Sequence, residues 1–242
     1  MTHPNRLEAW LQSPLGCRLL EQESRLADEA VAGFFGLYAL QVGCWGGSDM
    51  LLRAARTQRA AVVNAVAAPG ISLISSPTQL AITSDSVDGV VLPHILELSS
   101  NPHQVLREAH RVLVGDGHLL IQGFNPLSLW GLRHLLKFNR SVPGIQRLMP
   151  EYRINDWLSL LGFEVVERKR YFHSVPINRE SVLSKLEGLE LVGRNAWPRL
   201  AACYMIVARK RVYTLTPTKT PWRGKRKLVG GLVEPTSRIS CD

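Results

Sequence analysis

The pattern of apolar and polar positions along the chain predicts strands that alternate with helices. Apolar residues recur at helical spacing between Pro14 and Ala32, which predicts an amphipathic helix. Short, mostly apolar runs bounded by turn residues predict buried strands, at 37–42, 59–64, 71–75, 89–92, 118–123, 163–166 and 201–207. Further helices are expected at 48–55, 102–113, 126–138, 156–161 and 179–191.

Alternation of strands and helices predicts an α/β fold with a mostly parallel sheet. Crossover connections between parallel strands are right-handed and place helices on both faces of the sheet. The last two strands are separated by a long segment and are expected to form an antiparallel hairpin at one edge. We expect an N-terminal helical extension over 1–36, the α/β domain over 37–211 and a tail over 212–242.

Composition favours a folded intracellular protein. Hydrophobic residues make up 45% of the 242, which is enough for a sizeable core. The four cysteines are far apart and form no Cys-x-x-Cys pair, so neither a zinc ribbon nor a redox pair is predicted, and no metal site is expected. The most apolar run, 31–43, is shorter than the ~20 residues that cross a bilayer. We therefore expect no transmembrane segment and a cytoplasmic location.

Positive charge is concentrated at the C-terminus. Residues 209–242 hold nine Lys or Arg and two Asp or Glu, and so carry seven of the nine net positive charges. The tail is rich in Pro, Thr and Gly and lacks periodicity, which predicts disorder. Within 219–227, Trp222 stands beside four basic residues and suits RNA or another polyanion. An anionic lipid surface, an acidic protein and a purely solubilising role stay open as alternatives.

A glycine-rich turn after the strand 37–42 predicts a nucleotide or anion site. Gly43, Gly46 and Gly47 allow the backbone to approach a ligand, and Ser48 is a plausible N-cap for a following helix. A helix N-terminus there would present free N–H groups to an anion. A glycine turn alone is a weak signal, because many α/β proteins carry one after the first strand.

A second segment indicates which class of protein this glycine turn is typical of. It reads Ser-Val-Asp-Gly-Val-Val-Leu-Pro-His-Ile-Leu-Glu over 86–97 and continues through Leu-Arg-Glu-Ala-His-Arg-Val-Leu-Val-Gly-Asp-Gly over 106–117. The segment strongly resembles class I S-adenosylmethionine-dependent methyltransferases of the type 11 branch. The resemblance covers roughly 37–123. It implies a Rossmann-like seven-stranded sheet in the order 3-2-1-4-5-7-6, with strand seven antiparallel and S-adenosylmethionine lying across the carboxyl ends of strands one to four.

The resemblance also implies which positions contact the cofactor, here Gln41, Gly43, Cys44, Trp45, Gly46, Gly47, Asn64, Ser76, Pro77 and Leu92. Three of these positions are acidic in the family. Gln41 replaces the acid that organises the methionine end, Asn64 the acid that pairs with the ribose, and Ser76 the acid that holds the adenine. A neutral side chain at each position still forms hydrogen bonds, although weaker than charge-assisted ones.

Two residues of the site have several interpretations. Trp45 stands where the family has a second glycine, and it is a packing residue, an aromatic contact to the adenosyl group or a plug. His94 matches the family histidine near the methyl donor. It is a weak candidate for a general base, although a structural role is the commoner one for a single histidine at such a place.

The sequence therefore predicts a methyltransferase whose acceptor and oligomeric state are unknown. The alternative is a non-catalytic scaffold with this fold that binds RNA or a protein through its basic tail. A third, minor reading is another nucleotide-binding Rossmann-like enzyme, which the glycine spacing disfavours. The segment 126–138 is either an interfacial helix or, in the preferred reading, a helix that packs on the sheet or covers a substrate pocket.

Deleting residues 212–242 should leave the fold intact and remove salt-sensitive retention on heparin, because the basic cluster around Trp222 and four of the nine net positive charges leave with these residues. Retention is measured as the salt concentration that elutes each form, with the melting temperature as the control for folding. Equal elution of the two forms would contradict a polyanion-binding role for the tail.

Overall fold

The computed structural model describes residues 4–47, 51–136, 142–174 and 200–212, and its centre is one seven-stranded sheet. The strand order is β3-β2-β1-β4-β5-β7-β6. Strands β1 to β5 pair in parallel, and β7 runs antiparallel to both β5 and β6. The topology that the resemblance implied is thus confirmed. The strands are β1 (Phe35–Val42), β2 (Arg56–Asn64), β3 (Leu73–Ile74), β4 (Val87–Pro93), β5 (Leu113–Phe124), β6 (Phe163–Tyr171) and β7 (Cys203–Lys210).

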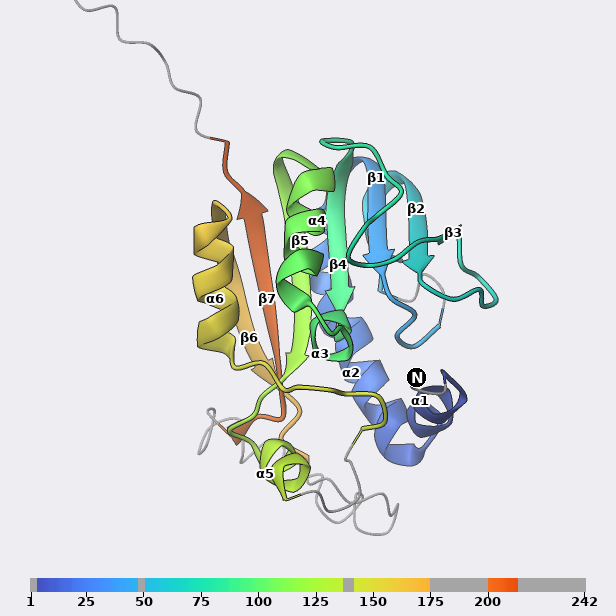
Figure 1. Cartoon of the computed structure of the whole chain (residues 1–242), viewed down its shortest axis with the longest axis vertical. Helices are drawn as coiled ribbons and strands as arrows, with labels where there is room; N and C mark the ends of the chain where they lie inside the picture. The colour runs from blue at the N-terminus through green and yellow to red at the C-terminus, as the bar shows by residue number, and fades with distance from the viewer. Residues whose placement is uncertain (1–3, 48–50, 137–141, 175–199, 213–242) are drawn as a thin grey trace, which may run out of the picture. The chain divides into compact units, whose positions relative to one another are not determined.

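Helices cover both faces of the sheet. They are α1 (Pro4–Leu11), α2 (Pro14–Val31), α3 (Ile95–Leu98), α4 (Pro102–Val112), α5 (Leu129–Leu135) and α6 (Glu151–Leu160). In Figure 1, α4 and α6 lie on one face of the sheet and α2 on the other. The short helices α1, α3 and α5 lie beyond the carboxyl ends of the parallel strands (Figure 1). Ligands of open α/β sheets bind at this end.

Alternation of side chains along the strands divides the core into two layers. On β1, Leu40 and Val42 face the layer that α4 and α6 cover, whereas Ala39 belongs to the layer that α2 covers. Successive side chains of a strand point to opposite faces, so Gln41 shares the α2 side with Ala39. This alternation decides which residues of the site enter the core and on which side.

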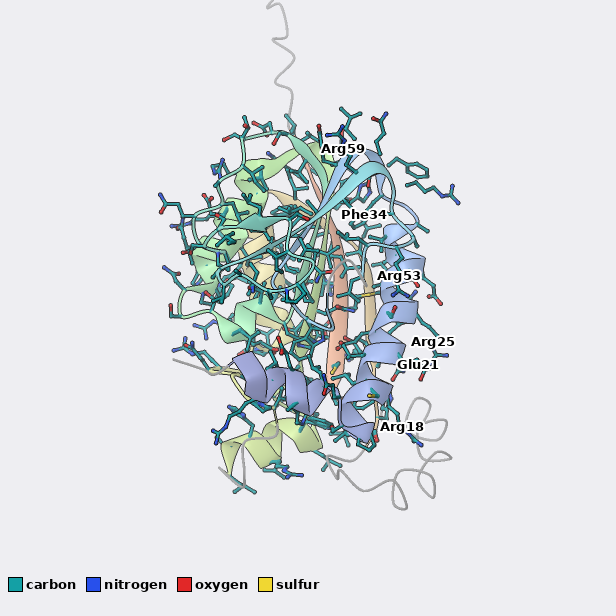
Figure 2. All side chains as sticks on the ribbon, turned by 90° about the vertical axis from the view of Figure 1, so that its right-hand side faces the viewer. Arg18, Glu21, Arg25, Phe34, Arg53 and Arg59 are labelled. Carbon is teal, nitrogen blue, oxygen red and sulfur yellow. The ribbon has the colours of Figure 1, made fainter. Side chains whose placement is uncertain are left out.

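Helix α2 is the main cover of its face. Ser13 caps it, because the Ser13 Oγ accepts a hydrogen bond from the Gly16 N–H at 3.2 Å. Every fourth residue of one stripe is buried, namely Leu15, Leu19, Glu23, Ala27 and Val31. Arg18, Glu21 and Arg25 lie along the outer side of the helix, as Figure 2 shows. An acid at the centre of an otherwise apolar stripe is unusual, and the contacts of Glu23 are described with the functional site below.

Local predictions differ from the structure in several places, of which three concern helices. The helix expected over 48–55 is wrong for residues 51–54, which form turns. The turn closes with a hydrogen bond from the Ala55 N–H to the Leu52 carbonyl, and β2 starts at Arg56. Helix α6 begins at Glu151, five residues earlier than predicted, and α1 was not predicted at all.

Other predictions lie outside the described residues. The helix over 179–191 and nearly all of the tail over 212–242 fall there. The described fold belongs to one unit, Met1–Val212, so the predicted extension over 1–36 packs in the same unit as the sheet. The domain boundaries themselves stay a prediction. None of the helices among the described residues is long and apolar enough to cross a membrane.

Candidate functional site

Two adjoining pockets lie at the carboxyl ends of β1, β2 and β4. The first has a volume of about 400 Å³ and the second about 410 Å³. Leu7, Asn64, Ile95 and Leu98 line both pockets, so we treat the two as one cleft. Each volume falls in the range of about 300–1,000 Å³ that is typical of small-molecule sites.

The glycine turn after β1 forms one end of the cleft. Gly43, Cys44 and Trp45 line the first pocket. Gly43 and Gly46 have φ angles of 98° and 76°, which residues with a side chain rarely adopt. Trp45, in contrast, is not among the residues with positive φ. Its position therefore does not require glycine, which explains how the loop tolerates an indole there.

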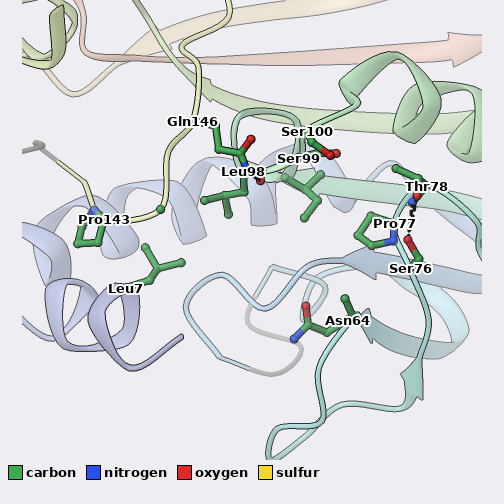
Figure 3. A pocket seen from close by; sticks show the side chains of 13 residues that line it. Leu7, Asn64, Ser76, Pro77, Thr78, Leu98, Ser99, Ser100, Pro143 and Gln146 are labelled. Atoms are coloured by element: carbon green, nitrogen blue, oxygen red, sulfur yellow. Dashed lines mark hydrogen bonds between the residues drawn. The ribbon is translucent and has the colours of Figure 1, made fainter. Parts of the chain in front are cut away.

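Ser76, Pro77 and Thr78 form the other end of the cleft, in the second pocket (Figure 3). The hydroxyls of Ser76 and Thr78 lie 2.9 Å apart and share a hydrogen bond. Asn64 stands between the two ends, and its Nδ2 donates to the Val66 carbonyl at 3.0 Å. Figure 3 shows the amide oxygen of Asn64 pointing towards the cleft, where it is available to accept a hydrogen bond from a ligand hydroxyl.

Four other residues that the resemblance assigned to the cofactor do not line the cleft. Gln41 and Leu92 are fully buried, and Gln41 donates from Nε2 to the Gly43 carbonyl at 3.0 Å, which supports the turn from within the core. Leu92 packs in the layer under α4, and the next residue, Pro93, lines the cleft in its place. Gly46 and Gly47 line a neighbouring pocket of about 400 Å³.

Sequence reasoning missed the residues that close the cleft from outside the motifs. Leu7 and Glu8 come from α1, and Ile95 and Leu98 from α3. A signal for α1 was present, because Pro4 at a helix start is followed by apolar residues at Leu7, Trp10 and Leu11. That α1 lies over the glycine turn was not readable from local pattern.

Behind the glycine turn lies a buried cluster of charged and aromatic side chains that we call the Glu23 cluster, made of Glu23, Trp45, His94, Glu97 and Tyr171. All five residues are at most 3% exposed. The Nε2 of His94 lies 2.7 Å from Oε1 of Glu23, and its Nδ1 lies 3.0 Å from Oε2 of Glu97. The indole N–H of Trp45 donates to Glu23 at 2.7 Å, and the Tyr171 hydroxyl donates to it at 3.1 Å.

The geometry selects one interpretation of Trp45. Its ring is 1% exposed and stacks at a tilt on the His94 ring, with a centroid separation of 4.1 Å. It belongs to the core layer under α2. The burial of the ring supports the packing interpretation, and the cleft stays open beside the ring.

Electrostatics of the cluster favour a protonated His94. Burial by itself lowers the pKa of His94, but the carboxylates of Glu23 and Glu97 outweigh this effect and raise the pKa to about 9. Burial raises the pKa of Glu97, and hydrogen bonds from His94 and from the Phe124 N–H offset this in part. An imidazolium held between two acids donates from both nitrogens and has no lone pair left to accept a proton.

Apart from Trp45, the residues of the Glu23 cluster do not line the cleft. His94 is fully buried and does not line the cleft, so its assignment as a general base gains no support from the geometry. The cleft walls consist of apolar, hydroxyl and amide side chains with one thiol, Cys44, and one carboxylate, Glu8. Such walls suit a ligand with an aromatic ring, hydroxyl groups and a small charged end.

Comparisons with known proteins agree with this geometry. A family model described as a methyltransferase domain matches residues 40–121. The uncharacterized protein YafS of Escherichia coli K12 is 34% identical over 210 residues, which cover 86% of this chain and 83% of that protein. The description of YafS states no activity, so this match shows a relative of the chain and does not identify a substrate.

Solved structures resemble the fold over most of the chain. One is a chain from the complex of the Haloferax volcanii Trm112 methyltransferase activator with a methyltransferase. It has a TM-score of 0.61 at 16% identity and covers 87% of this chain and 98% of its own. A second is a SAM-dependent methyltransferase from Archaeoglobus fulgidus, with a TM-score of 0.57 at 17% identity and coverage of 80% and 94%. At such identities these matches establish the fold.

The charged state of His94 should make stability fall as pH rises. A folded pKa of about 9 stands above the unfolded value of ~6.5, so the stabilisation is complete below about pH 6.5 and is lost as pH rises through about 9. Urea unfolding at pH 6 and pH 9 measures this difference. The pKa values of His103, His110 and His118 are lowered, mainly by burial, so these groups titrate below the window.

Substitutions distinguish the contribution of His94 to the pH dependence of stability from the contributions of other titrating groups. His94→Gln leaves two buried carboxylates without their cation, so it should lower stability by about 3–5 kcal/mol and flatten the difference between pH 6 and pH 9. Glu97→Gln, a second variant, should shift the loss of stability to lower pH. His103→Gln, on an exposed position of α4, should keep the wild-type profile. An unchanged profile in both cluster variants would show that His94 is not the titrating group.

Proposed function

This chain belongs to the class I S-adenosylmethionine-dependent methyltransferase family, and on that premise we propose that its cleft binds S-adenosylmethionine and transfers the methyl group to a bound acceptor. The observation that carries the proposal is the position of the cleft. One continuous opening runs from the glycine turn past Asn64 to Ser76 and Pro77, in the order expected for the methionine, ribose and adenine parts of the cofactor.

The residues present fit the cofactor. The glycine turn offers backbone N–H groups to the carboxylate, although no helix begins in residues 51–54 to add to them. The amide oxygen of Asn64 suits the ribose hydroxyls, and Ser76 suits a polar edge of the adenine. Leu7, Ile95 and Leu98 supply apolar walls for the ring. Gly43, Cys44 and Trp45 would border the methionine part.

Catalysis in this proposal is positioning. When bound, S-adenosylmethionine supplies an activated methyl group on a sulfonium. The chain's own residues bind the adenosyl part, exclude water from the apolar side of the cleft and hold the acceptor in line. Pro93 follows the buried Leu92 and lies in the wall nearest the glycine turn, so it would border the transfer position. His94 would act only through the loop that it holds, as a positioning residue.

The titratable side chains in the cleft walls restrict which acceptors the protein can methylate. Glu8 and Cys44 are the titratable side chains in the cleft walls among the described residues, and burial raises the pKa of Cys44. We therefore propose an acceptor whose nucleophilic atom reacts near neutral pH without a protein side chain that removes its proton. Cytoplasmic action remains part of the proposal. We also propose a protein partner, because the similar Haloferax volcanii structure is a complex of a methyltransferase with an activator protein.

Calorimetric titration with S-adenosylmethionine and S-adenosylhomocysteine tests the proposal. Binding of either ligand at micromolar to submillimolar concentration is the expected result. Absence of heat, together with an unchanged melting temperature at millimolar ligand, would overturn the enzyme and favour the non-catalytic scaffold.

Asn64 gives a sharper test within the cleft. Asn64→Asp should bind S-adenosylhomocysteine about fivefold more tightly, because a charge-assisted hydrogen bond is worth about 1 kcal/mol more than a neutral one. Asn64→Leu should weaken binding roughly tenfold for loss of the acceptor. Gln58→Glu adds the same charge to an exposed position of the same strand and serves as the control. Equal affinity in Asn64→Asp, Asn64→Leu and wild type would remove Asn64 from the site.

A further inference from the structure

The charge content of the cleft is unusual. Among the described residues that line its two pockets, Glu8 is the one with a formally charged side chain at neutral pH. The three positions where the family carries acids hold Gln41, Asn64 and Ser76, all neutral. A cofactor with a cationic sulfonium and an ammonium group thus meets a single carboxylate, and that carboxylate comes from outside the family motifs.

Glu8 is placed at the glycine-turn end of the cleft. It lines the first pocket together with Gly43 and Cys44, and it lines the neighbouring pocket together with Gly46 and Gly47. Its negative charge acts with burial to raise the pKa of Cys44, which is a second sign that the carboxylate lies close to the turn. It is therefore positioned at the end that would receive the methionine part.

Helix α1 holds Glu8 there. Leu7, the preceding residue, lines both pockets, and Figure 3 shows its side chain projecting from α1 towards the cleft. Residue Glu8 is exposed, and no side-chain hydrogen bond or ion pair to it is found among the described residues. A carboxylate that has no partner among the described residues and lies beside a ligand cleft is available to a cationic group of the ligand.

From this placement we propose that Glu8 binds the α-ammonium of the cofactor's methionine part, so that the N-terminal helix supplies the charge that Gln41 does not. The proposal rests on the proposed function, because it requires that the cleft bind the cofactor. It makes Glu8 a binding residue and α1 a component of the cofactor site. The ammonium is the chosen partner because Glu8 borders Gly46 and Gly47 as well as the cleft, whereas Asn64 does not line the pocket beside these two glycines.

The three ligands S-adenosylmethionine, S-adenosylhomocysteine and 5′-methylthioadenosine test the assignment. The first two carry the ammonium, only the first carries the sulfonium, and the third lacks the amino-acid part. Glu8→Gln should weaken binding of the first two about fivefold, as expected for a partly exposed charge-assisted bond, and change binding of 5′-methylthioadenosine less than twofold. Raising salt should weaken the wild type more than the variant.

Controls and contrary outcomes are distinct. Glu21→Gln removes an exposed acid from the outer side of α2 and should leave all three affinities unchanged. A loss confined to S-adenosylmethionine would place the carboxylate at the sulfonium and overturn the assignment to the ammonium. Equal loss for all three ligands, or no loss, would also overturn it while leaving the proposed function standing. A wild-type chain that binds none of the ligands would overturn both.

Discussion

The rest of the structure depends on the buried hydrogen bonds and ion pair that the Glu23 carboxylate forms. A buried anion is tolerated only when its oxygens are paired and hydrogen-bonded, and here His94, Trp45 and Tyr171 satisfy them. Each partner comes from a different part of the chain: the end of β4, the glycine turn and the end of β6. One acid on α2 thus joins the N-terminal helix to the parts of the sheet that shape the cleft.

The Glu23 cluster explains how the glycine turn is supported although residues 51–54, where a helix was expected, form turns. Residues 51–54 form turns, and the indole of Trp45 fills the core behind the loop. An aromatic residue at a position where the family has glycine therefore contributes packing and one hydrogen bond to Glu23. The loop is supported from the side of the core, and the side that faces the cleft remains open.

The N-terminal helices also account for the charge of the cleft. The strand positions that carry acids in the family are neutral here, and Gln41 is turned into the core, where it bonds to the Gly43 carbonyl. The remaining carboxylate at the cleft wall belongs to α1. Helix α2 therefore stabilises the turn from behind, and α1 covers it from the front, so a segment outside the methyltransferase motifs belongs to the architecture of the site.

Periodicity and the two motif segments were sufficient to predict the strands, their order, the antiparallel last strand and the cleft at the carboxyl ends. The strands follow from local pattern, and the position of the cleft follows from the general rule for open α/β sheets. The strand order and the antiparallel strand follow from the resemblance to the family. The sequence did not reveal that Pro93 lines the cleft in place of Leu92, because the end of the strand decides this. It also did not reveal that Glu23, in an apolar stripe, meets His94 from 71 residues away in the chain. Buried pairs and helix docking depend on long-range packing, which only the tertiary structure decides.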